Sequence, residues 1–368
     1  MKIIIGENYY AGIKDELTIY HSDDKIFEAL DNFILKYKEY QKLFFISYDL
    51  KNKIESLKSN NKDKVNFPVI KCIVPDKISP KEEFINQSNG TNIPLFFSPE
   101  IEKEKYLSIV KKIKNHIQKG DIYETNFCYG WNTHGKVHNP YVLYKKLESL
   151  TKAPFSVYAE FNDHVIICAS PERFLKKRGN QLISEPIKGT SKRSKIVEKD
   201  LELINQLKND PKERTENIMI VDLVRNDLSK IAEKKSVKVD ELCEVYSFEN
   251  IHQMISKVSC NINPNISFSE ILKSLFPMGS MTGVPKIRAM QLMEEYEFSK
   301  RGLYSGTIGV MQPNGDFDLN VVIRTIIYNK SNDFISFKVG GAITINSDPE
   351  KEYEETLVKA EAILKACR

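Results

Sequence analysis

The chain has 368 residues, 41% hydrophobic and 28% charged, which is the length and composition of a globular protein with a substantial core. Its formal charge of +4 is the small difference between 54 basic and 50 acidic residues, which argues against nucleic acid or a membrane surface as the partner. The six cysteines have neither Cys-x-x-Cys nor zinc spacing, and no apolar run approaches the ~20 residues of a membrane span. We therefore expect reduced thiols and a cytoplasmic location.

The first 95 residues combine short β-like runs with one amphipathic helix. Strands are predicted at 2–5, 43–48 and 69–74, and a helix near 25–40. The polar stretch 87–92 contains a glycine and is typical of a connection. We therefore expect a boundary near residue 95, between an N-terminal part at 1–95 and the remainder at 96–368.

From Ser98 onward, helices and strands are predicted to alternate. One helix is predicted to begin at Ser98-Pro99 and to end at Gly120-Asp121, and another spans 140–150. Strands are predicted at 155–161 and 164–169, joined by a short turn that favours antiparallel pairing. Because no glycine fingerprint of a dinucleotide fold is present, the pattern predicts an α+β fold and not a doubly wound one.

One lysine lies in an unusual local sequence, Pro186-Ile187-Lys188-Gly189-Thr190, after a short extended run. Proline fixes the backbone before the lysine and glycine lets it turn or approach a ligand after it, which predicts an ammonium carried on a shaped loop. The alternative is a solvated loop lysine, the commoner case in a chain rich in lysine.

Two later helices are predicted to begin in the same way, with an aspartate N-cap followed by proline, at Asp210-Pro211 and Asp348-Pro349. Each helix then carries two glutamates three residues apart, Glu213 and Glu216 in the first and Glu352 and Glu355 in the second. Residues three apart share a helix face, so the four carboxylates could bind one magnesium ion. The alternative is that each pair only complements the helix dipole.

Two other stretches contain residues that could bind a ligand. The glycine-containing loop at 279–286 lacks the Gly-Lys-Ser/Thr ending of a phosphate-binding loop, which argues against a nucleotide. Arg324 lies in an otherwise apolar predicted strand at 317–328, where it is either on the solvent face or a buried anchor for a carboxylate.

Together, these segments resemble the chorismate-utilising enzymes, and the matching motifs cover about 98–365 in the family's order. The motifs are Gly120-Asp121-Ile122-Tyr123, Ser170-Pro171-Glu172-Arg173-Phe174-Leu175, Pro186-Ile187-Lys188-Gly189-Thr190, Glu213-Arg214-x-Glu216-Asn217, Asp222-Leu223-Val224-Arg225-Asn226-Asp227, His252, Gly279-Ser280-Met281-Thr282-Gly283, Tyr304-Ser305-Gly306, Ile323-Arg324-Thr325, Gly340-Gly341 and Glu352-Tyr353-Glu354-Glu355-Thr356. The first 95 residues match only loosely, at 46–50, and look shorter than is usual in the family.

The resemblance implies a two-subdomain α/β sandwich with large antiparallel sheets, helices outside and the active site in the central cleft, where chorismate binds. Glu216 and Glu355 match direct magnesium ligands, and Glu213 and Glu352 match the outer positions that hold the ion's waters. The positions that match substrate-binding groups are Arg324 and Tyr304 on the enolpyruvyl carboxylate, the amides of Gly340 and Gly341 near it, and Thr282 and Thr190.

The resemblance also implies catalytic roles. Glu172 matches the general acid for the departing 4-hydroxyl, and His252 matches a histidine near the reacting ring. The isochorismate- and salicylate-forming branches carry a lysine where this chain has Glu124, and the anthranilate-forming branch carries alanine where it has Lys188. The implied activity is therefore 4-amination of chorismate through a covalent Lys188 adduct at C2, in p-aminobenzoate and folate synthesis.

Two expectations about this chemistry follow. A lysine nucleophile must be neutral, and at an unperturbed pKa near 10.4 only about 1 in 2,500 is neutral at pH 7, so we expect partial burial to lower the pKa of Lys188 by roughly 3 units. Glutamine is more usual at position 124 in the amino-transferring branches, so Glu124 either acts as a base or faces the sheet.

No glutaminase motif is visible, so the resemblance implies a separate glutaminase subunit that supplies ammonia. One alternative is the anthranilate-forming activity of the same family. Another is a non-catalytic subunit that binds an anionic metabolite or a glutaminase. The joint presence of Glu172, Lys188, Glu216 and Glu355 argues against the second alternative, because a binding module needs neither an acid nor a nucleophile.

Overall fold

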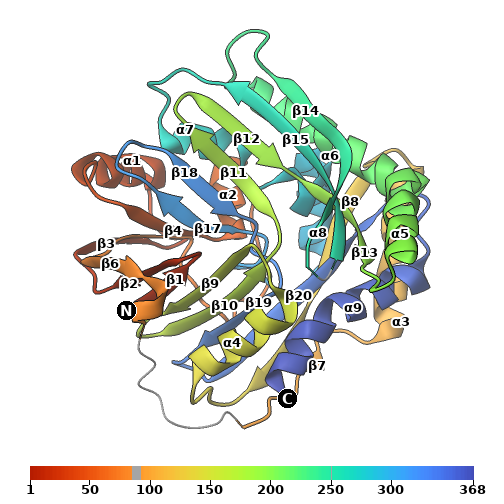
Figure 1. The fold of residues 1–368 in the computed structure, drawn as a ribbon, viewed down its shortest axis with the longest axis horizontal. Coiled ribbons are helices and arrows are strands. Elements are labelled where there is room, and N and C mark those ends of the chain that lie inside the picture. The colour runs from red at the N-terminus through yellow and green to blue at the C-terminus, as the bar shows by residue number, and fades with distance from the viewer. Residues whose placement is uncertain (85–92, 250) are drawn as a thin grey trace.

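The computed structural model describes residues 1–84, 93–249 and 251–368, and it has two large sheets with helices on their outer faces (Figure 1). Neighbouring strands pair antiparallel in both sheets, for example at β10–β9 and β4–β5. The predicted connection at 87–92 lies outside the described residues. The α+β class with large antiparallel sheets is confirmed.

Sheet A runs from a two-residue edge strand to a strand that pairs with the N-terminal hairpin. Its strands, in spatial order, are β16 (Gly283–Val284), β8 (Glu124–His134), β20 (Phe334–Ile343), β19 (Thr325–Asn329), β10 (His164–Ser170), β9 (Phe155–Glu160), β1 (Lys2–Ile5), β2 (Asn8–Ala11) and β6 (Lys77–Pro80), with β7 (Ser98–Pro99) paired to β8.

Sheet B is built mainly from the middle of the chain and ends on three strands of the N-terminal part. Its strands, in spatial order, are β13 (Ile187–Lys192), β15 (Ile251–Asn261), β12 (Gln181–Glu185), β11 (Arg173–Arg178), β18 (Phe317–Asn320), β17 (Thr307–Met311), β4 (Lys42–Ile46), β5 (Ile70–Val74) and β3 (Asp15–Ile19), with β14 (Lys238–Ser247) paired to β15.

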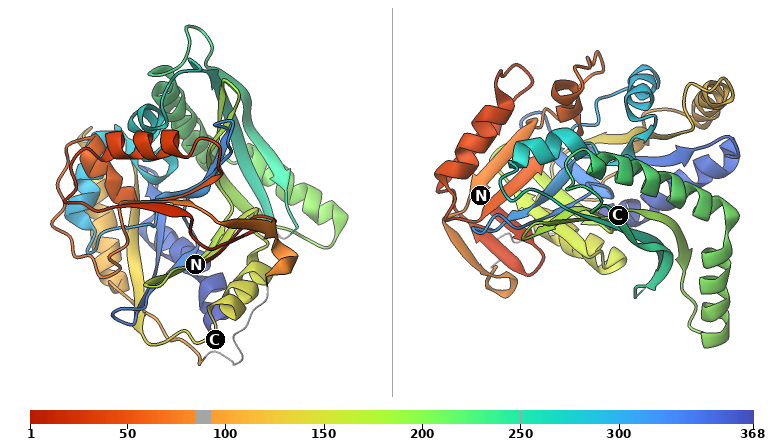
Figure 2. Two further views of the ribbon diagram at one scale, coloured as in Figure 1. Left: turned by 90° about the vertical axis from the view of Figure 1, so that its left-hand side faces the viewer. Right: turned by 90° about the horizontal axis from the view of Figure 1, so that it is seen from above.

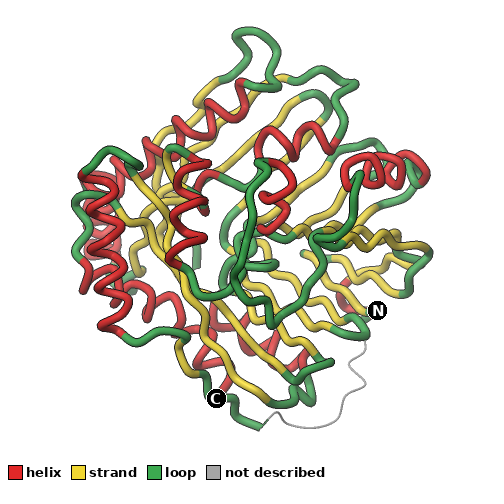
Figure 3. The backbone as a smooth tube through the Cα atoms, turned by 180° about the vertical axis from the view of Figure 1, so that it is seen from behind, coloured by secondary structure: helices red, strands yellow, loops and turns green. Residues whose placement is uncertain are grey.

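The helices lie outside the strands, as the view from behind shows (Figure 3). Those that pack on sheet B are α1 (Ile26–Lys36), α6 (Pro211–Ser229) and α7 (Phe268–Leu275). Those that pack on sheet A are α3 (Lys103–Gln118), α4 (Pro140–Thr151), α8 (Lys286–Tyr296) and α9 (Pro349–Cys367). The short α2 spans Lys51–Ile54, and α5 (Val197–Asn209) stands out from the body (Figure 2). No helix of the described residues is long and apolar enough to cross a membrane.

The sandwich core lies between the two sheets, and β4 shows how it forms. All five of its residues are buried, and their side chains alternate between the two faces of sheet B. Leu43 and Phe45 contribute to the cluster shared with sheet A, while Phe44 and Ile46 contribute to the cluster under α1 and α7. A strand that is buried on both faces has a continuous apolar sequence, and the sequence therefore predicts a strand here.

The structure corrects three local predictions. Ser98 and Pro99 form β7, and α3 begins at Lys103, because this segment pairs with β8 and Glu100 N–H donates to the Gly130 carbonyl. The predicted strand 317–328 is divided into β18 and β19, and Arg324 lies in the connection with a φ of 51°. Lys188 belongs to β13 and not to a free loop.

The N-terminal part contributes to both sheets, since β1 pairs with β9 of sheet A and β4 pairs with β17 of sheet B. The boundary near residue 95 stays a prediction.

Candidate active site

Lys188 is held on the outermost strand of sheet B by an irregular pairing. The register of β13 on β15 shifts between Ile187 and Thr190, and Gly189 within the shift has a φ of +91°. A Cβ at Gly189 would lie 3.1 Å from Glu213 Oε2, so glycine lets this strand lie directly against α6. Glycine was predicted to let the backbone turn or approach a ligand closely. In the structure, the group that the backbone approaches is the side chain of Glu213.

Lys188 forms an ion pair that joins the two sheets. Its Nζ donates to Glu124 Oε1 at 3.0 Å, and the side chains are 11% and 2% exposed respectively. Glu124 is the first residue of β8, so the contact connects sheet B to sheet A. Glu124 Oε2 is buried without a hydrogen-bond partner. Glu124 was expected either to act as a base or to face the sheet. The ion pair with Lys188 favours the first alternative, because it places the carboxylate beside an amine.

The expected lowering of the Lys188 pKa is wrong. Burial does favour the neutral amine, but the negative charges of Glu124, Glu216 and Glu172 outweigh it, and the pKa of Lys188 lies above its ordinary value. Desolvation acts in the expected direction, but the fold also gathers carboxylates around the amine that lie far from Lys188 in the sequence. The surrounding carboxylates therefore favour the ammonium form of Lys188.

Glu172 lies in the turn between β10 and β11, and its side chain has the properties of an acid. Burial raises its pKa to about 7, although a hydrogen bond from Ser280, the charge of Lys188 and the Ile187 N–H all act in the opposite direction. The turn is fixed by Ser170, whose Oγ donates to the Val321 carbonyl at 2.5 Å. A carboxyl group with a pKa near neutral can deliver a proton at physiological pH.

Arg324 is a half-buried cation that forms no ion pair or side-chain hydrogen bond with another described residue. Burial lowers the pKa of its guanidinium, and the charge of Glu172 partly opposes this effect. Its backbone has the left-handed conformation, which interrupts the extended strand at this residue. Tyr304 is buried, and the charges acting on its hydroxyl include Glu172. A cation without a carboxylate partner in a protein interior is a candidate anion site.

The two predicted acidic helix starts lie at the same place. Asp210 caps α6 by accepting from the N–H of Lys212 and Glu213, and Asp348 caps α9 by accepting from the N–H of Lys351. The glutamates that follow are brought together: burial raises the pKa of Glu213, and the charge of Glu355 from the other helix raises it further. The predicted helix starts and their proximity are thus present in the structure.

Lysines neutralise these carboxylates in the structure. Lys212 Nζ lies 3.0 Å from Glu352 Oε1 and 3.9 Å from Glu216 Oε1. Lys359 Nζ lies 2.7 Å from Glu355 Oε1 and donates to the Gly340 carbonyl at 2.9 Å. Neither lysine is among the predicted site residues, although their positions, beside Glu213 and four residues after Glu355, are those of counter-charges to an acidic cluster.

The donor set is suited to magnesium. Glu216 Oε1 is buried with no hydrogen-bond partner, and burial raises the pKa of this carboxyl to about 7, with Lys188 opposing. Carboxylate oxygens with unused acceptor capacity are what a hard cation binds. In the described part of the chain, however, no three His, Cys, Asp or Glu side chains lie close enough together to hold a metal. The carboxylates fit the ion chemically, and in this structure Glu352 and Glu355 are paired with lysines.

The paired glycines of β20 border this cluster. Gly340 is opposite Cys128 on β8, where a Cβ would lie 2.5 Å from the Phe127 carbonyl oxygen. A Cβ at Gly341 would lie 3.6 Å from Glu352 Oε2 and 3.9 Å from Lys359 Nζ, so this position faces the carboxylates. A side chain at position 340 would therefore clash with β8. Position 341 has space for a methyl group next to Glu352 and Lys359.

Three predicted residues lie less directly at the site. Thr282 is buried after a short helical turn, η3 (Gly279–Met281), with its hydroxyl bonded to the Met278 and Gly279 carbonyls. Thr190 is exposed on β13. His252 is fully buried on β15, with Nε2 3.0 Å from Asp200 Oδ1 and Nδ1 2.8 Å from Ser247 Oγ. His252 therefore contacts Asp200 and Ser247, and it forms no hydrogen bond with Lys188 or Glu172.

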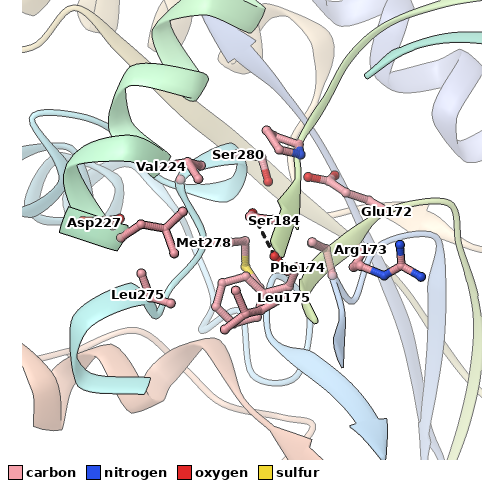
Figure 4. Close-up of a pocket in the computed structure, with 14 residues that line it drawn as sticks. Glu172, Arg173, Phe174, Leu175, Ser184, Val224, Asp227, Leu275, Met278 and Ser280 are labelled. Atoms are coloured by element: carbon pink, nitrogen blue, oxygen red, sulfur yellow. Dashed lines mark hydrogen bonds between the residues drawn. The ribbon is translucent and has the colours of Figure 1, made fainter. Parts of the chain in front are cut away.

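A small pocket of about 20 Å³ lies behind Glu172, and its wall is mainly apolar (Figure 4). Its residues come from α6, β11, β12 and the η3 turn, among them Val224, Phe174 and Met278. Glu172 and Ser280 are on its boundary, so the pocket contributes to the apolar surroundings that raise the Glu172 pKa.

Comparisons with known proteins agree with this arrangement. The family model described as chorismate binding enzyme matches residues 5–365. Aminodeoxychorismate synthase component 1 of Bacillus subtilis is 33% identical over 96% of this chain and 82% of that protein. Aminodeoxychorismate synthase of Arabidopsis thaliana is 40% identical over 74% of this chain, but only 30% of that longer protein is covered. The structure of anthranilate synthase component I from Streptococcus pneumoniae has the same fold, with a TM-score of 0.83, 23% identity, and coverage of 99% of this chain and 92% of that one.

Proposed function

The chain belongs to the chorismate-binding enzyme family, and on this premise we propose that it acts as an aminodeoxychorismate synthase component 1, converting chorismate and ammonia to 4-amino-4-deoxychorismate. The observation that carries the proposal is the buried Lys188, held beside the acid Glu172 and paired with Glu124. A nucleophilic amine next to a proton donor suits replacement of a hydroxyl group by an amino group. The product would be a precursor of p-aminobenzoate and folate.

Substrate binding follows from the charges at the site. Arg324 is available for the enolpyruvyl carboxylate of chorismate, with Tyr304 and the β20 backbone at Gly340 and Gly341 beside it. Glu216 and Glu355 would hold a magnesium ion, with Glu213 and Glu352 around it. When bound, the ion would supply the positive charge that neutralises the ring carboxylate.

Lys188 becomes a nucleophile by giving its proton to Glu124. The transfer along the 3.0 Å hydrogen bond converts an ammonium and a carboxylate into a neutral amine and a carboxylic acid. The neutral pair suits a site from which chorismate has displaced water, since low polarity disfavours separated charges. Glu124 then keeps this proton while the lysine is bound to the substrate.

The amine of Lys188 adds to C2, the ring double bonds shift, and the C4–O bond breaks. Glu172 gives its proton to the leaving hydroxyl, which departs as water. Ammonia then adds at C4, the C2–N bond to Lys188 breaks, and the proton released from the new C4 ammonium returns to Glu172. The enolpyruvyl group is retained throughout.

Ammonia would come from a separate glutaminase subunit, as expected from the resemblance. The word component in the name of the B. subtilis relative supports a two-part enzyme. We place the reaction in the cytoplasm, in keeping with six cysteines that are all buried and unpaired.

Product analysis tests this proposal against the anthranilate-forming alternative. The purified chain, given chorismate, magnesium and ammonium but no glutaminase, should release 4-amino-4-deoxychorismate and no anthranilate. Mass spectrometry during turnover should find a chorismate-derived adduct on the Lys188 peptide. Lys188→Ala should lose the adduct, while Lys192→Ala, an exposed lysine on the same strand, should keep it. Release of anthranilate and pyruvate by the wild type would overturn the proposal.

A further inference from the structure

Lys212 sits where the two metal-binding helices meet. It lies in the first turn of α6, next to Glu213, and its ammonium reaches across to α9 to contact Glu352 Oε1 at 3.0 Å. The same ammonium lies 3.9 Å from Glu216 Oε1 on its own helix. One cation thus contacts a carboxylate from each of the pairs assigned to magnesium.

The ammonium of Lys212 is surrounded by carboxylates from two helices, Glu352 at 3.0 Å and Glu216 at 3.9 Å, and these negative charges favour its charged form. Glu352 is 2% exposed, so without a nearby cation its carboxylate would be buried with an unbalanced charge. The side chain of Lys212 is 40% exposed, which leaves its flexible stem a path to solvent.

We propose that Lys212 is an internal counter-cation of the magnesium site, which joins α6 to α9 while the site holds no metal and turns out to solvent when a divalent ion binds. This inference rests on the metal assignment in the proposed function. The ammonium lies near Glu216, a direct ligand in the metal assignment, and occupies Glu352 Oε1, which would otherwise accept a hydrogen bond from a water of the ion. Two cations at one cluster also repel each other. Lys212 therefore sets how tightly the metal binds, without contacting the substrate.

Calorimetric titration of the chelator-treated full chain with Mg²⁺ alone tests this inference. Lys212→Met removes the charge but keeps the length of the side chain, and its affinity for Mg²⁺ should rise about five- to tenfold, the loss of one charge-assisted competitor. Lys212→Arg keeps the charge and should bind Mg²⁺ as the wild type does. Lys230→Met is the matched control, because Lys230 forms an ion pair with Asp227 at the other end of the same helix, 2.8 Å away and 49% exposed.

Thermal unfolding gives a second readout that does not depend on activity. Lys212→Met should have a lower midpoint than the wild type in chelator, because the contact between α6 and α9 is lost, and Mg²⁺ should raise its midpoint by more than it raises that of the wild type. Unchanged or weaker Mg²⁺ binding by Lys212→Met, or an equal gain in Lys230→Met, would overturn the inference.

The outcomes separate this inference from the proposed function. If the wild type binds Mg²⁺ and Lys212→Met binds it no better, only the role of Lys212 is wrong. If the wild type binds no Mg²⁺, both the metal assignment and the role of Lys212 are wrong. The lysine adduct and the product of the wild type still decide the remainder of the proposed function on their own.

Discussion

The ion pair of Lys188 with Glu124 is central to the proposed reaction, and Glu124 is the position where the resemblance leads us to expect glutamine. A glutamine at position 124 could accept a hydrogen bond from Lys188 but could not take its proton. With Glu124, the proton has a destination 3.0 Å away and need not reach solvent. The proposed reaction at neutral pH depends on this internal acceptor.

We predict that Glu124→Gln slows formation of the Lys188 adduct near neutral pH and makes it rise with pH. Solvent must then remove the proton, and each pH unit gives about ten times more neutral amine until the lysine pKa is reached. Single-turnover mass spectrometry from about pH 6 to about pH 9 measures this rate. Identical profiles for the wild type and Glu124→Gln would exclude Glu124 as the acceptor.

Glu172 gives a second prediction at the residue scale, for stability. Burial raises its pKa from 4.5 to about 7, so the folded chain holds this proton to a higher pH than the unfolded chain does. Its contribution to the free energy of unfolding is therefore fully present below about pH 4.5 and is lost as the pH rises through about 7. Glu172→Gln, a permanently neutral isostere, should show a smaller decrease in this interval, measured by urea unfolding in chelator.

The same substitution should lower kcat by roughly a hundred- to ten-thousand-fold, because an amide cannot protonate the leaving hydroxyl. Steady-state kinetics with the wild-type chain as reference measures this loss. Near wild-type turnover by Glu172→Gln would require another acid.

At the scale of elements, β20 contains two adjacent glycines, Gly340 and Gly341, whose surroundings differ. Gly340→Ala should destabilise the chain strongly, because the new methyl group would meet the Phe127 carbonyl oxygen at 2.5 Å, inside the pairing of β20 with β8. Gly341→Ala should unfold like the wild type, since its methyl group has ordinary contacts at 3.6 Å and beyond. Yet Gly341→Ala should lose activity, because the methyl group projects beside Glu352. Denaturant unfolding and turnover, measured on both variants, check this contrast.

Elements that carry their own local signals could be predicted from the sequence. The start of α6 and that of α9 are marked by an aspartate and a proline, and both helices begin where predicted. Arg324 carries no such mark, since a run of β-branched residues conceals the break before β19. The pKa of Lys188 could not be predicted from the sequence for another reason. It depends on carboxylates of β8 and α6, whose distances from the lysine are determined only by the fold.

At the scale of the whole molecule, the sheets are held together by the cluster to which Phe45 belongs. This side chain is fully buried and packs on Phe161, which directly follows β9 of the other sheet, with ring centroids 5.2 Å apart. Phe45→Ala should lower the free energy of unfolding by about 3–5 kcal/mol, the usual cost of a large cavity. Chemical denaturation measures the loss, and Phe96→Ala, which is 74% exposed, should show almost none.

The two-sheet architecture was predictable only through the resemblance to a family. Periodicity indicated most strands, but it does not say which strand lies beside which. Pairings between distant segments, such as Ile46 with Thr307, leave no trace in local sequence. The site is assembled by the same long-range pairings, so its residues could be named from motifs while their contacts could not.

The position of β4 also affects how the protein is made. On the ribosome, β5 emerges soon after β4 and can cover one of its edges, but β17, which covers the other, is translated much later. At typical elongation rates of 5–20 residues per second, one edge of the strand that contains Phe44 and Phe45 stays unpaired in the nascent chain for roughly fifteen to fifty seconds. Newly synthesised chains are therefore exposed to aggregation for most of their synthesis, and a chaperone that binds apolar extended segments should be found on them near β4.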